Sequence, residues 1–97
     1  VFVVDTAGGL DALTLTAELR AAGVTADRAY ENRSMKSQMK VADRSGAAIA
    51  VIIGTDERDA GAAAVRTLAD GAQSLVPRAD VLATIRQILS NQQNTEA

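Results

Sequence analysis

The first half of the chain alternates short apolar runs with longer stretches of helix-forming residues. A valine-rich run at residues 2–4 stops at Asp5 and is followed by Thr-Ala-Gly-Gly, which predicts a buried strand that leaves into a loop. Residues 10–22 are good helix formers with apolar positions on two faces, closed by Gly23, so this helix is expected to be covered on more than one side. Residues 24–31 alternate imperfectly and are polar enough for an edge strand.

A second helix and a central strand follow. The helix is predicted to start at an N-cap, Ser34 or the competing Asn32, and to close at Gly46. Its buried stripe is expected at positions i, i+4 and i+7, namely Met35, Met39 and Ala42. Residues 47–53 form the most continuous apolar run of the chain, which favours a strand covered on both faces.

A hairpin and a last helix complete the pattern. Residues 54–61 are predicted to be a polar connection, and the apolar runs at 62–68 and 72–76 flank Ala-Asp-Gly, which is typical of a hairpin. After Pro77, the apolar spacing of residues 81–89 predicts an amphipathic helix that packs on the sheet.

This order, β-α-β-α-β-β-β-α, predicts an α/β fold. Strands joined through helices pair in parallel by right-handed crossovers, whereas the hairpin adds an antiparallel strand. We therefore expect a three-layer α/β/α domain at residues 1–89, with a mixed five-stranded sheet and three helices, and a disordered polar tail at 90–97. Because the chain opens inside a strand and without Met, we interpret it as a piece of a longer polypeptide.

Composition removes several classes of chemistry. The 97 residues include no Cys and no His, which excludes disulfides, thiolate nucleophiles, ordinary zinc sites and a histidine general base. The only aromatic residues are Phe2 and Tyr30, so a row of aromatic side chains for base stacking is absent. No apolar run approaches the length of a membrane span.

Positive charge gathers at residues 33–44, although the whole chain carries a net charge of −2. Four basic residues, spaced 3, 4 and 4 apart, would project from one side of the second helix. They are Arg33, Lys36, Lys40 and Arg44. The periodicity alone fits both a solvated helix face and a phosphate-binding face.

Two other groups of residues invite a ligand. Gly8 and Gly9 follow the first strand, but the spacing fits neither the dinucleotide fingerprint nor the P-loop, and a flexible turn is the simpler interpretation. Asp5, Asp56 and Glu57 would meet at the carboxyl rim of a parallel sheet, as in a phospho-receiver. That class is discounted because the second acidic residue beside Asp5 and the lysine after the last strand are missing.

The sequence from Tyr30 to Asp80 resembles the carboxyl-terminal anticodon-binding domain of bacterial histidyl-tRNA synthetases. The resemblance is carried by ENRSMKSQMKVADRSGA, by AVIIGTDE with its polar turn, and by VRTLADGAQSLVPRADV. It extends over nearly the whole chain, from Val1 to about Leu89. It implies a non-catalytic module that binds the anticodon stem-loop of tRNA, and a parent histidine–tRNA ligase whose absent catalytic domain holds ATP and Mg²⁺.

The resemblance also implies which residues contact RNA. By position, the tRNA-binding residues are expected to be Asn32, Arg33, Lys36, Lys40, Glu57 and Arg66. Carboxylate and amide groups suit base edges, and the basic groups of residues 33–40 suit backbone phosphates. No catalytic, cofactor or metal residue is expected in this chain. Its small Ala62, Ala63 and Ala64, and its lack of further aromatic residues, depart from the family and put base stacking in doubt.

The implied partners are the tRNA(His) anticodon loop and the catalytic domain of a cytoplasmic, homodimeric enzyme, with no membrane contact. Two other functions stay open at this point. One is an interdomain or dimer-contact module that uses the alanine-rich strand at 62–68, and the other is a stand-alone small-ligand domain that uses Asp5, Gly8 and Gly9.

Overall fold

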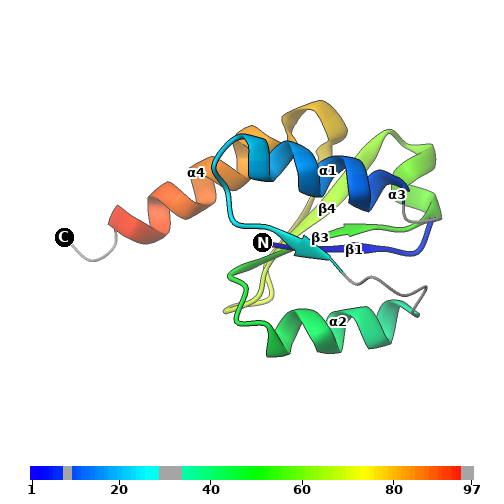
Figure 1. Cartoon of the computed structure of the whole chain (residues 1–97), viewed down its shortest axis with the longest axis horizontal. Coiled ribbons are helices and arrows are strands. Elements are labelled where there is room, and N and C mark those ends of the chain that lie inside the picture. The colour runs from blue at the N-terminus through cyan, green and yellow to red at the C-terminus, as the bar shows by residue number, and fades with distance from the viewer. Residues whose placement is uncertain (8–9, 29–33, 95–97) are drawn as a thin grey trace.

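Five strands form one mixed sheet with helices on both faces (Figure 1). The computed structural model describes residues 1–7, 10–28 and 34–94, with side chains described as far as Ser90. The predicted α/β fold and mixed five-stranded sheet are confirmed, with one short additional helix. The elements are β1 (Phe2–Asp5), α1 (Leu10–Ala21), β2 (Asp27–Arg28), α2 (Met35–Arg44), β3 (Ile49–Ile53), α3 (Thr55–Asp59), β4 (Ala62–Thr67), β5 (Gln73–Pro77), a 3₁₀ turn (Arg78–Asp80) and α4 (Val81–Asn94).

The strand order is β2-β1-β3-β4-β5. Strand β1 runs parallel to both β2 and β3, and the predicted hairpin forms β4 and β5, with β4 antiparallel to β3. Its turn contains Gly71 at φ +73°, a conformation that glycine adopts without strain. Because β1 and β3 are parallel, Asp5 and Ile53 meet at the same rim of the sheet.

The core lies on both faces of the sheet. Helices α1 and α4 cover one face, and α2 covers the other (Figure 1). The larger cluster contains Leu15 and Leu19 from α1 and Val81 and Ile85 from α4, packed on the sheet. The smaller cluster joins Ala42 of α2 to the other face, with four sheet residues: Phe2, Val4, Ile52 and Ala64. Apart from Phe2, the buried residues of both clusters are aliphatic.

The connection at residues 54–61, predicted to be merely polar, contains the short helix α3. Its N-cap, Gly54, has an extended backbone, and Asp56 and Glu57 occupy the first turn. Carboxylates are favourable there because the helix dipole is positive at its N-terminus. No residue of α3 is buried, so apolar periodicity could not have indicated it.

The last helix and the second strand also differ in extent from the prediction. Helix α4 continues to Asn94, beyond the expected end near Leu89, since the sequence offers no Gly or Pro to stop it. Residues 95–97 lie outside the described residues, and the predicted division into a domain at 1–89 and a tail at 90–97 remains a prediction. Residues 29–31 also lie outside them, so the predicted end of the second strand at residue 31 remains a prediction. In the described part, no helix is both long and apolar enough to cross a membrane.

Helix α1 is covered on one side, contrary to the prediction of cover on more than one. Its inner side is buried, whereas Leu10 is 68% exposed and Leu13 is 52% exposed. Ala17, four residues after Leu13, is exposed as well. This side of α1 points away from the sheet, and no further layer of the described chain lies over it (Figure 1).

Candidate nucleic-acid interface

Two of the six residues expected to contact RNA, Asn32 and Arg33, lie outside the described residues. The remaining four are Lys36 and Lys40 on α2, Glu57 on α3 and Arg66 on β4. They form two groups, a basic stripe on a helix and a polar edge around an open part of the sheet.

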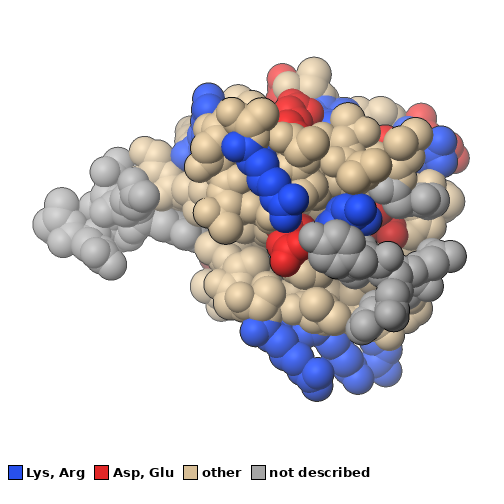
Figure 2. Space-filling view, in the orientation of Figure 1, with Lys and Arg blue, Asp and Glu red and all other residues tan. Residues whose placement is uncertain are grey.

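The basic stripe is on the outer side of α2. Ser34 caps this helix as predicted, its hydroxyl oxygen accepting from the N–H of Ser37 at 3.2 Å. Gln38 and Ala42 are buried against the sheet, so helical geometry turns the basic residues the other way. Those exposed residues are Lys36, Lys40 and Arg44. Figure 2 shows basic side chains gathered along this helix, at the lower edge of the molecule.

Basic side chains elsewhere on the described chain are mostly held by internal partners. Four arginines donate hydrogen bonds at 2.8–3.0 Å: Arg20 to the carbonyl of Ala26, Arg58 to Ala7, Arg78 to the carboxylate of Glu18, and Arg86 to the carbonyl of Ala22. By contrast, the side chains of Lys36, Lys40 and Arg44 make no hydrogen bond or ion pair with other described residues. The α2 side of the molecule therefore presents unneutralised positive charge.

Helix α2 leaves the β4–β5 end of its sheet face open. A groove of about 250 Å³ lies there, with carboxylates at one wall and an apolar floor. It is lined by Asp56, Glu57, Ala60, Ala64, Gln73, Ser74 and Leu75. Ala64 pairs directly across from Leu75, which is 64% exposed. Since Ala64 also belongs to the cluster under α2, the groove lies beside that helix.

Arg66 stands next to this groove. It pairs across the ladder with Gln73, a residue of the groove lining, and directly opposite residues of antiparallel strands share a face. Its Nε is buried and has no hydrogen-bond partner among the described residues. A buried donor without a partner is costly, so a ligand that accepts a hydrogen bond here would be favoured.

Glu57 lies over the carboxyl ends of β1 and β3. A Cβ built on Gly54 would meet Glu57 Oε2 at 3.3 Å and the hydroxyl oxygen of Thr6 at 3.6 Å. Because Gly54 has no side chain, the carboxylate of Glu57 can occupy this space. The carboxylate is half-buried and lines the groove, where it can accept a hydrogen bond from a base edge.

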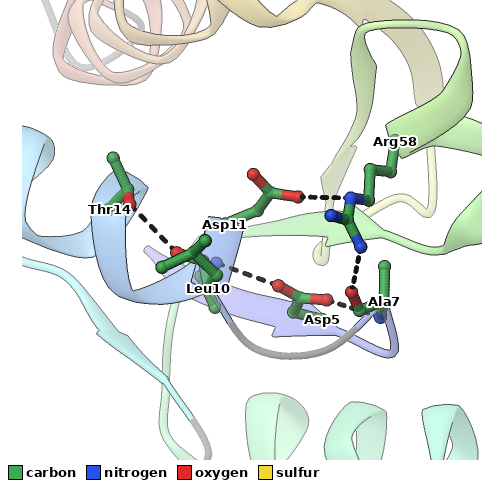
Figure 3. A network of polar contacts seen from close by, with 7 residues as sticks. Asp5, Ala7, Leu10, Asp11, Thr14 and Arg58 are labelled. Atoms are coloured by element: carbon green, nitrogen blue, oxygen red, sulfur yellow. Dashed lines mark hydrogen bonds and ion pairs between the residues drawn. The ribbon is translucent and has the colours of Figure 1, made fainter.

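Asp5, a candidate for the acidic rim, has a structural role (Figure 3). It is 7% exposed, and its two carboxylate oxygens accept from the N–H of Ala7 at 2.6 Å and of Ala12 at 3.0 Å. The same loop is bound by Arg58, which donates to the carbonyl of Ala7 at 2.8 Å and lies 3.7 Å from the carboxylate of Asp11. Asp5 therefore orders the turn into α1 rather than facing a ligand.

Sequence reasoning missed two residues of this region. Arg58 was not singled out, because its partners are distant in the sequence. Gln38 is 3% exposed, and its side-chain amide pairs with the main chain of Asp5. A signal did exist for Gln38, since it lies three residues after Met35 and four before Ala42, within the predicted apolar stripe.

The two alternative functions rested on a pair of glycines and on an alanine-rich strand, and the structure describes only the strand. Gly8 and Gly9 lie outside the described residues. The alanine-rich strand does not offer an exposed apolar face, because residues 62–65 are buried. Among the described residues, no group of three or more acidic side chains is arranged to hold a metal ion.

Residues 2–88 match the family described as anticodon binding domain. The match includes the sheet, α2 and the groove, and the chain belongs to this family of domains. Within it, the similarity is to histidyl-tRNA synthetases, as the sequence resemblance indicated.

Curated relatives and solved structures agree on this point. The chain is 46% identical over 77 residues to histidine–tRNA ligase of Saccharopolyspora erythraea, covering 79% of this chain and 18% of that protein. It is 46% identical over 90 residues to the ligase of Moorella thermoacetica, covering 91% and 21%. The crystal structure of apo histidyl-tRNA synthetase from S. aureus superimposes with a TM-score of 0.77 at 30% identity, over 86% of this chain and 22% of that one. The chain thus spans about a fifth of the length of these proteins.

Replacing Asp5 by Asn tests the structural role of its carboxylate. The amide has one accepting oxygen instead of two, and its NH₂ group would face a main-chain donor, so the free energy of unfolding should fall by about 1–3 kcal/mol. Urea denaturation measures this loss. Asp59→Asn, an exposed substitution in α3, is the control and should change stability by less than about 0.5 kcal/mol. Equal stability of the two variants would contradict the capping role.

Proposed function

We propose that the chain binds the anticodon stem-loop of tRNA(His) as the anticodon-binding domain of a histidine–tRNA ligase. The supporting observation is the distribution of charge: the arginines around α1, α3 and α4 have internal partners, whereas Lys36, Lys40 and Arg44 have none among the described residues. Exposed, unpaired cations on one helix are the electrostatic footprint that a phosphate backbone needs. The net charge of −2 makes this attraction local.

The proposed contacts divide into two kinds. Lys36 and Lys40 are point charges for backbone phosphates, which supply affinity and its salt dependence but little sequence information. We assign the same part to Arg33. Glu57 and Arg66 stand beside the open groove, where a carboxylate accepts from, and a guanidinium donates to, the edge of an unstacked base. Asn32 is assigned to base contact as well.

The chain has no catalytic part in this proposal. Aminoacylation, together with ATP and Mg²⁺, is assigned to the catalytic domain of the parent ligase, which we take to be a cytoplasmic homodimer. The anticodon-binding domain contributes by holding the tRNA. The names of the relatives and the fraction of their length that the chain spans support this division.

Replacing Lys40 by Ala should weaken binding of the anticodon stem-loop for every loop sequence. The slope of log Kd against log salt concentration should fall by roughly 1, since one phosphate contact is lost. Fluorescence anisotropy at several salt concentrations measures both effects. Arg86→Ala removes the same charge on α4, where the arginine already has a carbonyl partner, and should leave the slope unchanged. Equal effects of the two substitutions would place the RNA elsewhere.

Replacing Glu57 by Gln should relax base preference rather than weaken binding uniformly. The carboxylate is acceptor-only, whereas the amide also donates, so discrimination among loops that differ in one anticodon base should drop by about 1–3 kcal/mol at the affected position. Titrating a set of single-base loop variants measures this. Asp59→Asn removes one negative charge from the same helix outside the groove lining and should keep the preference intact. Unchanged discrimination in Glu57→Gln would remove this residue from the site.

A second contact is favoured by the exposed side of α1. Leu10 and Leu13 are more than half exposed, and with Ala17 they form one apolar stripe on the sheet face opposite α2. We propose that this stripe packs against the remainder of the parent ligase and leaves α2 free for RNA. It replaces the strand at 62–68 as the surface for the interdomain contact, because residues 62–65 of that strand are buried.

Replacing Leu10 and Leu13 together by Ser should lower the unfolding temperature of the full-length ligase but not that of the isolated chain. Each leucine lost from a buried contact should lower the stability of that contact by about 1.5–3 kcal/mol. Exposed leucines, by contrast, contribute little to the stability of the isolated domain. Thermal unfolding of both forms measures the difference. Ala83→Ser on the exposed side of α4 is the control. An unchanged unfolding temperature of the full-length variant would show that the stripe faces solvent.

A further inference from the structure

Gln38 is one of the few buried polar residues of the described chain and has a specific partner. It is 3% exposed; its Oε1 accepts from the N–H of Asp5 at 2.9 Å, and its Nε2 donates to the carbonyl of Asp5 at 2.9 Å. The two hydrogen bonds join α2 to the end of β1, 33 residues earlier in the chain. A side-chain amide offers the same donor and acceptor pair as a peptide group.

The position of this contact in the sheet explains why it is needed. In the described chain, β2 pairs with β1 at Phe2 and Val3, and its last paired residue is Arg28. The N–H and carbonyl of Asp5 point to the same edge two residues further on, where the amide of Gln38 takes the place of a strand. Leaving two buried main-chain groups without partners would cost far more than placing a glutamine there.

The amide also constrains the orientation of α2. The other α2 residues in or against the cluster on this face are Met35, Met39, Val41 and Ala42, and contacts of apolar side chains are not directional. Two hydrogen bonds to one peptide unit are directional and fix both rotation and register. A shift of the helix by one residue would turn its outer side by about 100°.

Lys36 and Lys40 flank Gln38 in the sequence and project from the opposite side of the same helix. Neither has an intramolecular partner among the described residues that could hold its position. Their placement relative to the groove at Glu57 therefore depends on how α2 is seated. Helix α3, which carries Glu57 at the wall of the groove, is anchored next to the end of the same strand. Arg58 of this helix donates to the carbonyl of Ala7, and Asp5 of β1 accepts from the N–H of Ala7 (Figure 3).

We infer that Gln38 is a positioning residue for RNA binding: by pairing with the main chain of Asp5 it sets the rotation of α2 and thus aims Lys36 and Lys40 at the phosphates beside the groove. The inference rests on the proposed function. It assigns to a buried side chain, which touches no RNA, control over the electrostatic part of the affinity.

The test compares Gln38→Met with a variant of matched stability on the other face of the sheet. Methionine keeps the length of the side chain and removes both hydrogen bonds to the main chain of Asp5. Ile85→Ala, in the core under α4, is the control for lost stability. Both are titrated with the anticodon stem-loop RNA at a temperature where circular dichroism shows them fully folded. We expect Gln38→Met to bind about tenfold more weakly, with a salt slope reduced by roughly 1, and Ile85→Ala to bind within about twofold of the wild type.

A second variant tests the hydrogen bonds separately from the shape. In Gln38→Glu the ionised carboxylate cannot donate to the carbonyl of Asp5, whereas the protonated acid restores one donor and one acceptor. Burial raises the pKa of the introduced carboxyl, so the variant loses affinity as the pH rises through that pKa and regains it as the pH falls. The ratio of its Kd to that of the wild type should therefore be smaller at about pH 5 than at pH 8.

The possible outcomes distinguish a failure of the role inferred for Gln38 from a failure of the proposed function. If the wild type binds the stem-loop and the folded Gln38→Met variant binds it equally well with the same salt slope, Gln38 does not position the lysines. A Kd ratio for Gln38→Glu that is independent of pH would count against the two hydrogen bonds. If the wild type itself shows no salt-dependent binding, the proposed function fails, whatever the variants do.

Discussion

The main chain of Asp5 sets the constraint on which the rest of the structure depends. Its N–H and carbonyl are buried on the edge of β1 beyond the described pairing with β2, and they can be satisfied only by a group that another element brings to them. Helix α2 brings Gln38. The carboxylate of the same residue binds the N–H groups of Ala7 and Ala12 and so starts α1 on the other face. One strand end thus fixes helices on both sides of the sheet.

Charge is sorted by face as a consequence of this architecture. On the α1 and α4 side, arginines serve to join elements, as when Arg78 binds Glu18 at 3.0 Å and Arg86 binds the carbonyl of Ala22. Helix α2 is held by Gln38 and by apolar side chains, so its basic residues are not needed for the fold. They remain available for a partner, which is why a chain of net charge −2 can present a basic face.

Local signals allowed most of the fold to be predicted from the sequence. Gly23, Gly46 and Gly71 have positive φ and end or turn the elements that they were expected to end or turn, because such conformations depend on the residue itself. Helix α3 could not be predicted in this way, since none of its side chains is buried. The apolar positions on two faces of α1 led to the wrong prediction that its outer side is covered, because cover depends on which layers exist.

The candidate site was predictable to the extent that it depends on one helix. The outward direction of Lys36 and Lys40 follows from the stripe at Met35, Met39 and Ala42. The contacts that place this helix join residues far apart in sequence: Gln38 binds Asp5 across 33 residues, and Arg58 binds Ala7 across 51. No local pattern encodes such pairs. The groove likewise could not be predicted from the sequence, because it exists only where α2 leaves the β4–β5 end of the sheet uncovered.

If an anticodon base binds in the groove, as proposed, the described residues of the groove lining offer it no aromatic side chain for stacking. Phe2 is buried in the core, and the exposed apolar residues of the groove lining are Ala60 and Leu75. Leucine offers apolar contact to any base, so it adds affinity without preference. Preference must then come from groups that are penalised when unpaired, and the buried Nε of Arg66 is such a group. In the proposed site, a base that accepts from it would relieve this unsatisfied donor and a base that cannot accept would not, so preference would rest on the gain from the right partner.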